Sequence, residues 1–100
     1  MRRAAKVDAS QSAIVNALRN VGCSVQSLAQ LGDGAPDLLV GRHGRNYLLE
    51  VKTGAKASQL NATQAQWHRL WRGSVYVVRT PEEALAAVGF TFPASGGGAS

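Results

Sequence analysis

Two carboxylates and an amine near the middle of the chain have types and spacing that can do chemistry. Asp37 begins a short β-rich run, and Glu50-Val51-Lys52 lies in the next one. If His43-Gly44 forms a two-residue hairpin loop, the two runs pair so that Asp37 lies directly opposite Glu50. Opposed side chains on one sheet face have Cβ atoms roughly 4.5–5.5 Å apart. A loop with an odd number of residues would break this register.

The chemistry that this group predicts is metal-assisted hydrolysis of a phosphodiester. Opposed carboxylates repel each other unless a cation lies between them, and oxygen ligands at this spacing suit Mg²⁺ or Mn²⁺. Side chains alternate along a strand, so Lys52 shares a face with Glu50. Lys52 can then orient or activate a water and offset charge in the transition state. The alternative is that Glu50 and Lys52 form an ordinary ion pair on an exposed strand face. The position of Pro36-Asp37 across the hairpin from Glu50 weakens this alternative.

The elements that must position these residues follow the order α-β-β-β-α-β-α. Helices are predicted at 9–21, 64–72 and from 81, and strands at 23–30, 37–41, 47–53 and 74–79. Capping boxes beginning at Thr63 and Thr80 mark the starts of the second and third helices. Residues 1–90 therefore form one α/β domain, whereas the Gly, Ser and Ala-rich segment 91–100 is predicted to be disordered.

Composition narrows the class of protein. One hundred residues, 45% hydrophobic and 17% charged, indicate one soluble globular domain with a thin core, and exclude coiled coils and wholesale disorder. There is no apolar run of about 18 residues that could span a membrane and no secretory leader, so we expect a cytoplasmic protein. A single cysteine, Cys23, cannot form an internal disulfide, fits a reducing compartment, and is expected to pack as a small apolar residue.

Positive charge points to a polyanionic partner. Eleven Lys and Arg against six Asp and Glu give a net charge of +5, and residues 42–79 contain seven cations and one anion. A solvated basic surface that serves solubility is the alternative. The candidate DNA contacts are Arg42, His43, Arg45, Lys56, Arg69 and Arg72.

These motifs together resemble a known group of enzymes. Gly34-Ala35-Pro36-Asp37, Glu50-Val51-Lys52 and Gln64 in the following helix resemble the PD-(D/E)XK nuclease superfamily, in particular small stand-alone VRR-NUC-like nucleases of phages and prophages. The resemblance runs from about Asp8 to Val88. It implies a restriction-endonuclease-like core, a mixed β-sheet flanked by helices, and Mg²⁺- or Mn²⁺-dependent DNA cleavage. For short stand-alone members it also implies a Holliday-junction-resolvase-like homodimer.

The resemblance assigns roles residue by residue. It implies catalytic roles for Asp37, Glu50, Lys52 and Gln64, with the first two and the Val51 carbonyl as metal ligands. Relatives often carry an acidic residue on the first helix that reaches the metal, and this chain has none there. Either Gln11 serves as a neutral ligand or water-holder, or the site holds its ion more weakly.

The second predicted helix places Gln64, Trp67, His68 and Trp71 on one stripe. We expect the two tryptophans to be core residues rather than a stacking platform for bases. Gln64, at the edge of this stripe, could point toward the sheet face that carries Asp37, Glu50 and Lys52. His68 is expected to be hydrogen-bonded or solvent-facing, with contact to phosphate as the alternative.

The sequence therefore predicts a metal-dependent endodeoxyribonuclease that cuts branched or structured DNA in a bacterial host cell, of phage or prophage origin. The missing acid on the first helix motivates an alternative, a DNA-binding module that keeps the nuclease fold without turnover. A basic assembly protein of a phage particle is a third possibility, which only size and charge favour.

Overall fold

The computed structural model describes residues 9–52 and 59–91, and its four strands form a mixed sheet. The strands lie in sequence order: β1 (Ser24–Ser27), β2 (Leu38–Arg42), β3 (Arg45–Val51) and β4 (Val75–Val78). The first three pair antiparallel, and β4 pairs parallel to β3 after a crossover. A parallel neighbour requires such a crossover, and here it contains a helix. The predicted element order is confirmed.

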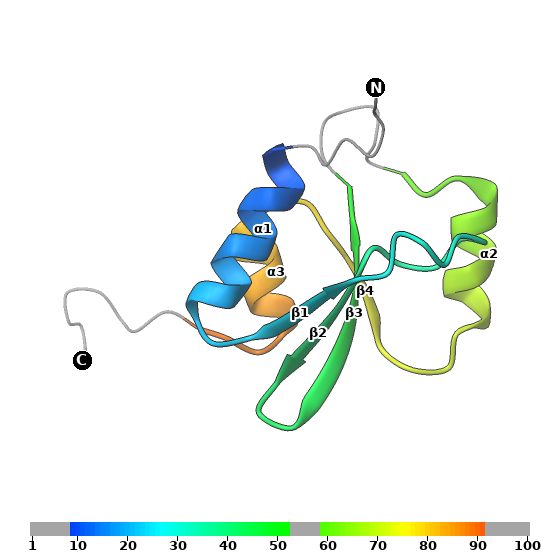
Figure 1. Ribbon diagram of the computed structural model, residues 1–100. Coiled ribbons are helices and arrows are strands. Elements are labelled where there is room, and N and C mark those ends of the chain that lie inside the picture. Colours follow the sequence, from blue (N-terminus) through cyan, green and yellow to red (C-terminus); the bar gives the residue numbers. More distant parts are fainter. Residues whose placement is uncertain (1–8, 53–58, 92–100) are drawn as a thin grey trace.

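Helices flank the sheet on both sides (Figure 1). α1 (Ala9–Asn20) and α3 (Pro81–Ala87) lie together on one side, and α2 (Ala62–Leu70) lies on the other. The predicted mixed sheet flanked by helices is therefore confirmed.

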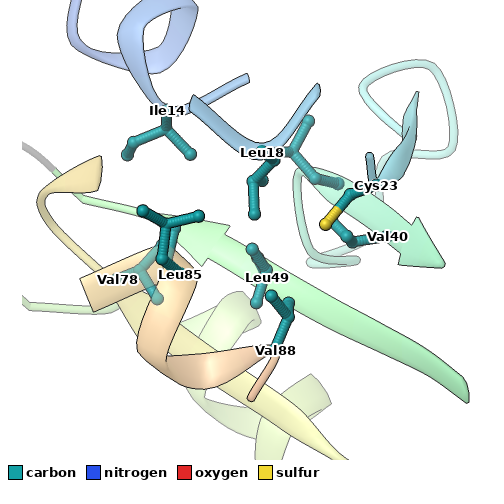
Figure 2. Packing of buried hydrophobic residues seen from close by; sticks show 10 residues of the cluster. Ile14, Leu18, Cys23, Val40, Leu49, Val78, Leu85 and Val88 are labelled. Carbon is teal, nitrogen blue, oxygen red and sulfur yellow. The ribbon is translucent and has the colours of Figure 1, made fainter. Parts of the chain in front are cut away.

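The hydrophobic core lies between the sheet and the α1–α3 pair (Figure 2). Ile14 and Leu18, one turn apart on α1, are completely buried, as are Val40 and Leu49 on the central strands. Cys23 is buried among them, as predicted, and burial raises the pKa of its thiol against the opposing effect of Arg42. This packing fixes the central strands, and with them the residues that the strands carry on their other face.

The β2–β3 hairpin closes through a two-residue loop. His43 and Gly44 both have positive φ, 52° and 78°, as a type I′ turn requires. The ladder runs from Arg42 opposite Arg45 to Leu38 opposite Leu49. The predicted register is therefore present, and it leads directly to the position of Asp37 across from Glu50.

The start of α2 corrects one prediction. The N-cap is Asn61, whose side chain accepts a hydrogen bond from the Gln64 N–H at 2.9 Å. The Gln64 side chain accepts in return from the Asn61 N–H at 3.0 Å. The predicted capping box at Thr63 is wrong because Asn is at least as good an N-cap as Thr and meets a Gln three residues later. The helix begins two residues earlier than predicted.

Other boundaries differ by a few residues. β1 is shorter than the predicted strand 23–30 because the chain turns after Ser27, with a Leu31 N–H to Leu28 carbonyl bond of 3.0 Å. α3 starts as predicted, with Thr80 as its N-cap and Pro81 in its first turn. Of the tail predicted to be disordered, 92–100 lie outside the described residues. Within 9–52 and 59–91, no helix has the length and apolar character of a membrane span.

Candidate active site

Asp37 is fixed against β3 by two hydrogen bonds. Its N–H donates to the Leu49 carbonyl at 3.0 Å, and its carboxylate oxygen Oδ2 accepts from the Val51 N–H at 2.8 Å. Both partners flank Glu50 in the chain. The Asp37 carboxylate therefore lies beside the residue that the sequence places opposite it.

Glu50 is a buried acid, with 1% of its surface exposed. Burial, and then the negative charge of Asp37 and a hydrogen bond with its side chain, raise the pKa of Glu50 to about 8, against the opposing effect of Lys52. The structure thus brings Asp37 and Glu50 together as predicted. The raised pKa means that Glu50 keeps its proton to a higher pH than an ordinary carboxyl group does.

Lys52 follows β3 directly and stays close to the buried acid. Its Nζ lies 3.9 Å from Glu50 Oε2, and its side chain is 14% exposed. A hydrogen bond of 3.0 Å from the Lys52 N–H to the Val78 carbonyl continues the β3–β4 pairing to this residue. The partly exposed ammonium group therefore lies on the same side of the sheet as Glu50, where the strand alternation predicts it.

Gln64 joins the start of α2 to the site. Its Nε2 donates to Glu50 Oε2 at 3.1 Å, while its Oε1 accepts from the Asn61 N–H in the capping box. Both ends of the amide are used, so the side chain is held in one orientation. The predicted position of Gln64 at the edge of the metal face agrees with this geometry.

His68 is a site residue that sequence reasoning missed. Its Nε2 lies 3.8 Å from Glu50 Oε1, and both atoms are buried without a hydrogen-bond partner among the described residues. Burial, and then Lys52, lower the pKa of His68. The Nε2 atom is therefore not hydrogen-bonded within the described part of the chain, and it faces Glu50 rather than solvent. The available signal was its position one helical turn after Gln64, on the same stripe.

A comparison with solved structures found a similar fold. A chain described as a VRR_NUC domain superposes with a TM-score of 0.65 at 24% sequence identity, over 83% of this chain and 94% of that chain. The chain has a VRR-NUC-like nuclease fold. No protein-family profile matches the sequence, and no curated protein matches it.

The donor set in this VRR-NUC-like fold suits a hard divalent cation. Two carboxylates meet, and Glu50 Oε1 is buried without a hydrogen-bond partner among the described residues. In the described part of the chain, no three His, Cys, Asp or Glu side chains form a ready-made metal cluster. An ion bound by Asp37 and Glu50 would complete its shell with backbone carbonyl, water and phosphate oxygens, as Mg²⁺ commonly does. The residues present therefore fit the ion.

Two other predicted metal ligands are Gln11 and the Val51 carbonyl. Gln11 lines a separate hollow with Ser27 and Leu38, between α1 and the sheet. The N–H of Val51 is bound to Asp37. Ion ligation by Gln11 and by the Val51 carbonyl stays a prediction.

The predicted DNA contacts lie in two places. His43 and Arg45 are exposed at the hairpin tip, roughly 17 Å along β3 from Glu50 at about 3.4 Å per residue. Arg42 instead joins the hairpin to the C-terminal end of α3, donating to the Val88 carbonyl at 3.2 Å with its guanidinium over the Phe90 ring. Arg69 and Arg72 are exposed at the end of α2 and just after it, and Lys56 lies outside the described residues. Contact of these side chains with DNA stays a prediction.

An apolar groove of about 530 Å³ separates α2 from the sheet. Its lining includes Leu31, Leu48, Trp67 and Trp71. The two indole rings stack with centroids 4.6 Å apart, and Trp71 is 46% exposed. The expectation that the two tryptophans are core residues is wrong, because the core lies on the other face of the sheet and neither tryptophan is fully buried.

Proposed function

We propose that the protein is a metal-dependent endonuclease that hydrolyses phosphodiester bonds in branched or otherwise structured DNA. The observation that carries this proposal is the Asp37 carboxylate held beside buried Glu50 by the 2.8 Å hydrogen bond from the Val51 N–H, with the Lys52 amine 3.9 Å from Glu50. The VRR-NUC-like fold and the net charge of +5 support it.

Each residue of the group has a chemical role in this proposal. Asp37 and Glu50 would hold Mg²⁺ or Mn²⁺, with the Val51 carbonyl as a further ligand. When bound, such an ion supplies a Lewis acid for the phosphate and lowers the pKa of a bound water. The Lys52 ammonium, 3.9 Å from Glu50 Oε2, offsets negative charge that develops on the phosphate and orients the attacking water. Gln64 keeps Glu50 in one orientation through its 3.1 Å hydrogen bond.

A cleavage panel tests the proposal. Duplex, nicked and four-way synthetic DNAs are incubated with purified protein and Mg²⁺ or Mn²⁺. We expect Lys52→Ala and Asp37→Ala to reduce cleavage by about a hundredfold or more while binding persists, because the first removes the positive charge near the reacting phosphate and the second removes a metal ligand. Arg19→Ala, which removes one positive charge from α1 together with the exposed 3.1 Å hydrogen bond to the Val25 carbonyl, should cut like the wild type. Wild-type protein that cuts none of these DNAs would contradict the proposal.

A DNA-binding module without turnover is the second candidate, and the first turn of α1 favours it because it carries no acidic residue. This candidate predicts DNA binding that weakens steeply with salt and yields no products. Calorimetry with Mn²⁺ separates the two functions, because a binder that has lost its metal site takes up no ion.

A homodimer remains part of the endonuclease proposal, since a symmetric junction requires two cuts. Exposed apolar side chains on and near α2, namely Leu31, Leu70 and Trp71, offer surface for self-association.

A further inference from the structure

The carboxylate of Glu50 is satisfied on one side only. Its Oε2 accepts the hydrogen bond from Gln64 at 3.1 Å and lies near Lys52. Its Oε1 and the Nε2 of His68 lie 3.8 Å apart, and neither has a hydrogen-bond partner among the described residues. An unsatisfied buried polar atom costs about 1–3 kcal/mol, so two such atoms facing each other indicate a third group between them.

We propose that His68 is a ligand of the divalent ion that Glu50 binds, so that α2 adds a nitrogen donor to the oxygen donors of the sheet. This inference rests on the proposed metal-dependent function. It assigns a metal-binding role to a residue outside the predicted Asp37, Glu50 and Lys52 group.

The separation of the two atoms favours an ion over a direct hydrogen bond. A hydrogen bond requires a distance of about 2.7–3.2 Å, and the observed distance is 3.8 Å. Two donors on one ion, with bonds of about 2.1 Å, lie roughly 3.0–3.4 Å apart at octahedral or tetrahedral angles. A shift of about 0.4–0.8 Å therefore brings both atoms onto one ion.

The position of His68 on α2 allows this small shift. Gln64, one turn earlier, already bonds Glu50 and so holds this face of the helix toward the acid. None of the nine residues of α2, all of them described, is fully buried, so moving the helix disrupts little core packing. The approach of His68 to Glu50 thus continues a contact that exists.

A nitrogen ligand changes which ion the site prefers. Mg²⁺ selects oxygen ligands, whereas imidazole suits first-row transition metals, whose affinities rise from Mn²⁺ through Co²⁺. The inference therefore predicts that the site binds Mn²⁺ and Co²⁺ more tightly than Mg²⁺. The part of this preference that comes from His68 is measurable in a variant.

Calorimetric titrations of the full-length protein without DNA measure that part. We expect His68→Gln to weaken Co²⁺ binding about tenfold or more and to change Mg²⁺ affinity little. The matched control is His43→Asn, which removes the chain's other histidine and tolerates the positive φ of the hairpin tip. This control should bind all three ions like the wild type. Equal losses for Mg²⁺ and Co²⁺ in His68→Gln would overturn the inference.

A spectroscopic measurement on the wild type makes the test independent of how any variant folds. Pulsed electron paramagnetic resonance of bound Mn²⁺ should detect coupling to an imidazole nitrogen, which persists in His43→Asn and disappears in His68→Gln. Wild-type protein that binds Mn²⁺ without nitrogen coupling overturns the role of His68 and leaves the endonuclease proposal standing. Wild-type protein that takes up no ion overturns both.

Discussion

We expect the substitution Glu50→Gln to stabilise the metal-free protein at neutral pH while it removes ion binding. Glu50 is 1% exposed, and burial followed by the Asp37 charge raises its pKa from 4.5 to about 8. An amide of the same shape has no proton to lose, and its oxygen can still accept the hydrogen bond from Gln64. The variant therefore keeps the hydrogen bond with Gln64 and avoids the cost of protonating Glu50 on folding.

The magnitude follows from the raised pKa. The folded state holds the Glu50 proton more tightly than the unfolded state, so this stabilisation is complete below pH 4.5 and is lost as the pH rises through about 8. Within that window the free energy of unfolding falls by up to about 1.4 kcal/mol per pH unit, or about 3 kcal/mol from pH 4.5 to 7. Burying the amide has a cost of its own. We therefore expect the advantage of Glu50→Gln over the wild type to grow with pH, from about zero at pH 4.5 to about 1–3 kcal/mol at pH 7.

Urea unfolding followed by circular dichroism, in a chelator and at several pH values, measures this gain. The control is Glu82→Gln, which removes an exposed acid from the first turn of α3. It should lower stability at neutral pH by about 0.5 kcal/mol, the opposite sign, because it loses a favourable interaction with the helix dipole. An advantage of Glu50→Gln that does not depend on pH, or a loss of stability at pH 7, would refute the reasoning.

Ion binding completes the same experiment. Mn²⁺ at a hundred times its Kd should add about 2.7 kcal/mol to the unfolding free energy of the wild type and nothing to that of Glu50→Gln. An equal gain in both proteins would show that the ion binds elsewhere.

Two further substitutions test how α2 is held. Gly34 has a φ of +85°, and a Cβ there would lie 2.6 Å from the Thr63 carbonyl oxygen, so Gly34→Ala should cost about 2 kcal/mol or more in urea unfolding. Gly32→Ala, also at positive φ but with no described atom within 4 Å of the added Cβ, is the matched control and should cost about 1 kcal/mol. Asn61→Ala should cost about 1 kcal/mol in thermal unfolding by removing the N-cap, and should weaken Mn²⁺ binding because the capping partner Gln64 also holds the site. Asn61→Asp keeps the acceptor and should restore both; a variant that restores neither would contradict the capping role.

The central part of the site could be predicted because it depends on local rules. The His43-Gly44 pair favours a two-residue turn, the turn length sets the register, and the strand period sets the face. These rules place Asp37 opposite Glu50 without any knowledge of tertiary packing. The fold order followed in the same way from glycines, capping residues and apolar spacing.

The α2 side of the site could not be predicted in the same way. Sequence spacing puts Gln64 and His68 on one stripe, but the distance and rotation of the helix relative to the sheet decide which side chain reaches Glu50. Those quantities depend on packing around the apolar groove. Arg42 shows the same limit: its sequence neighbours indicate a DNA contact, and the Val88 carbonyl and Phe90 ring that it binds are distant in sequence.

The uneven burial of the two halves of the site has a consequence for protein engineering. Glu50 lies in β3 next to Leu49, which is completely buried, so substitutions in this strand are expected to destabilise the fold. None of the nine residues of α2 is fully buried, and two of them, Gln64 and His68, approach the same carboxylate. A library that randomises this helix while leaving β2 and β3 intact should yield folded proteins with altered ion selectivity.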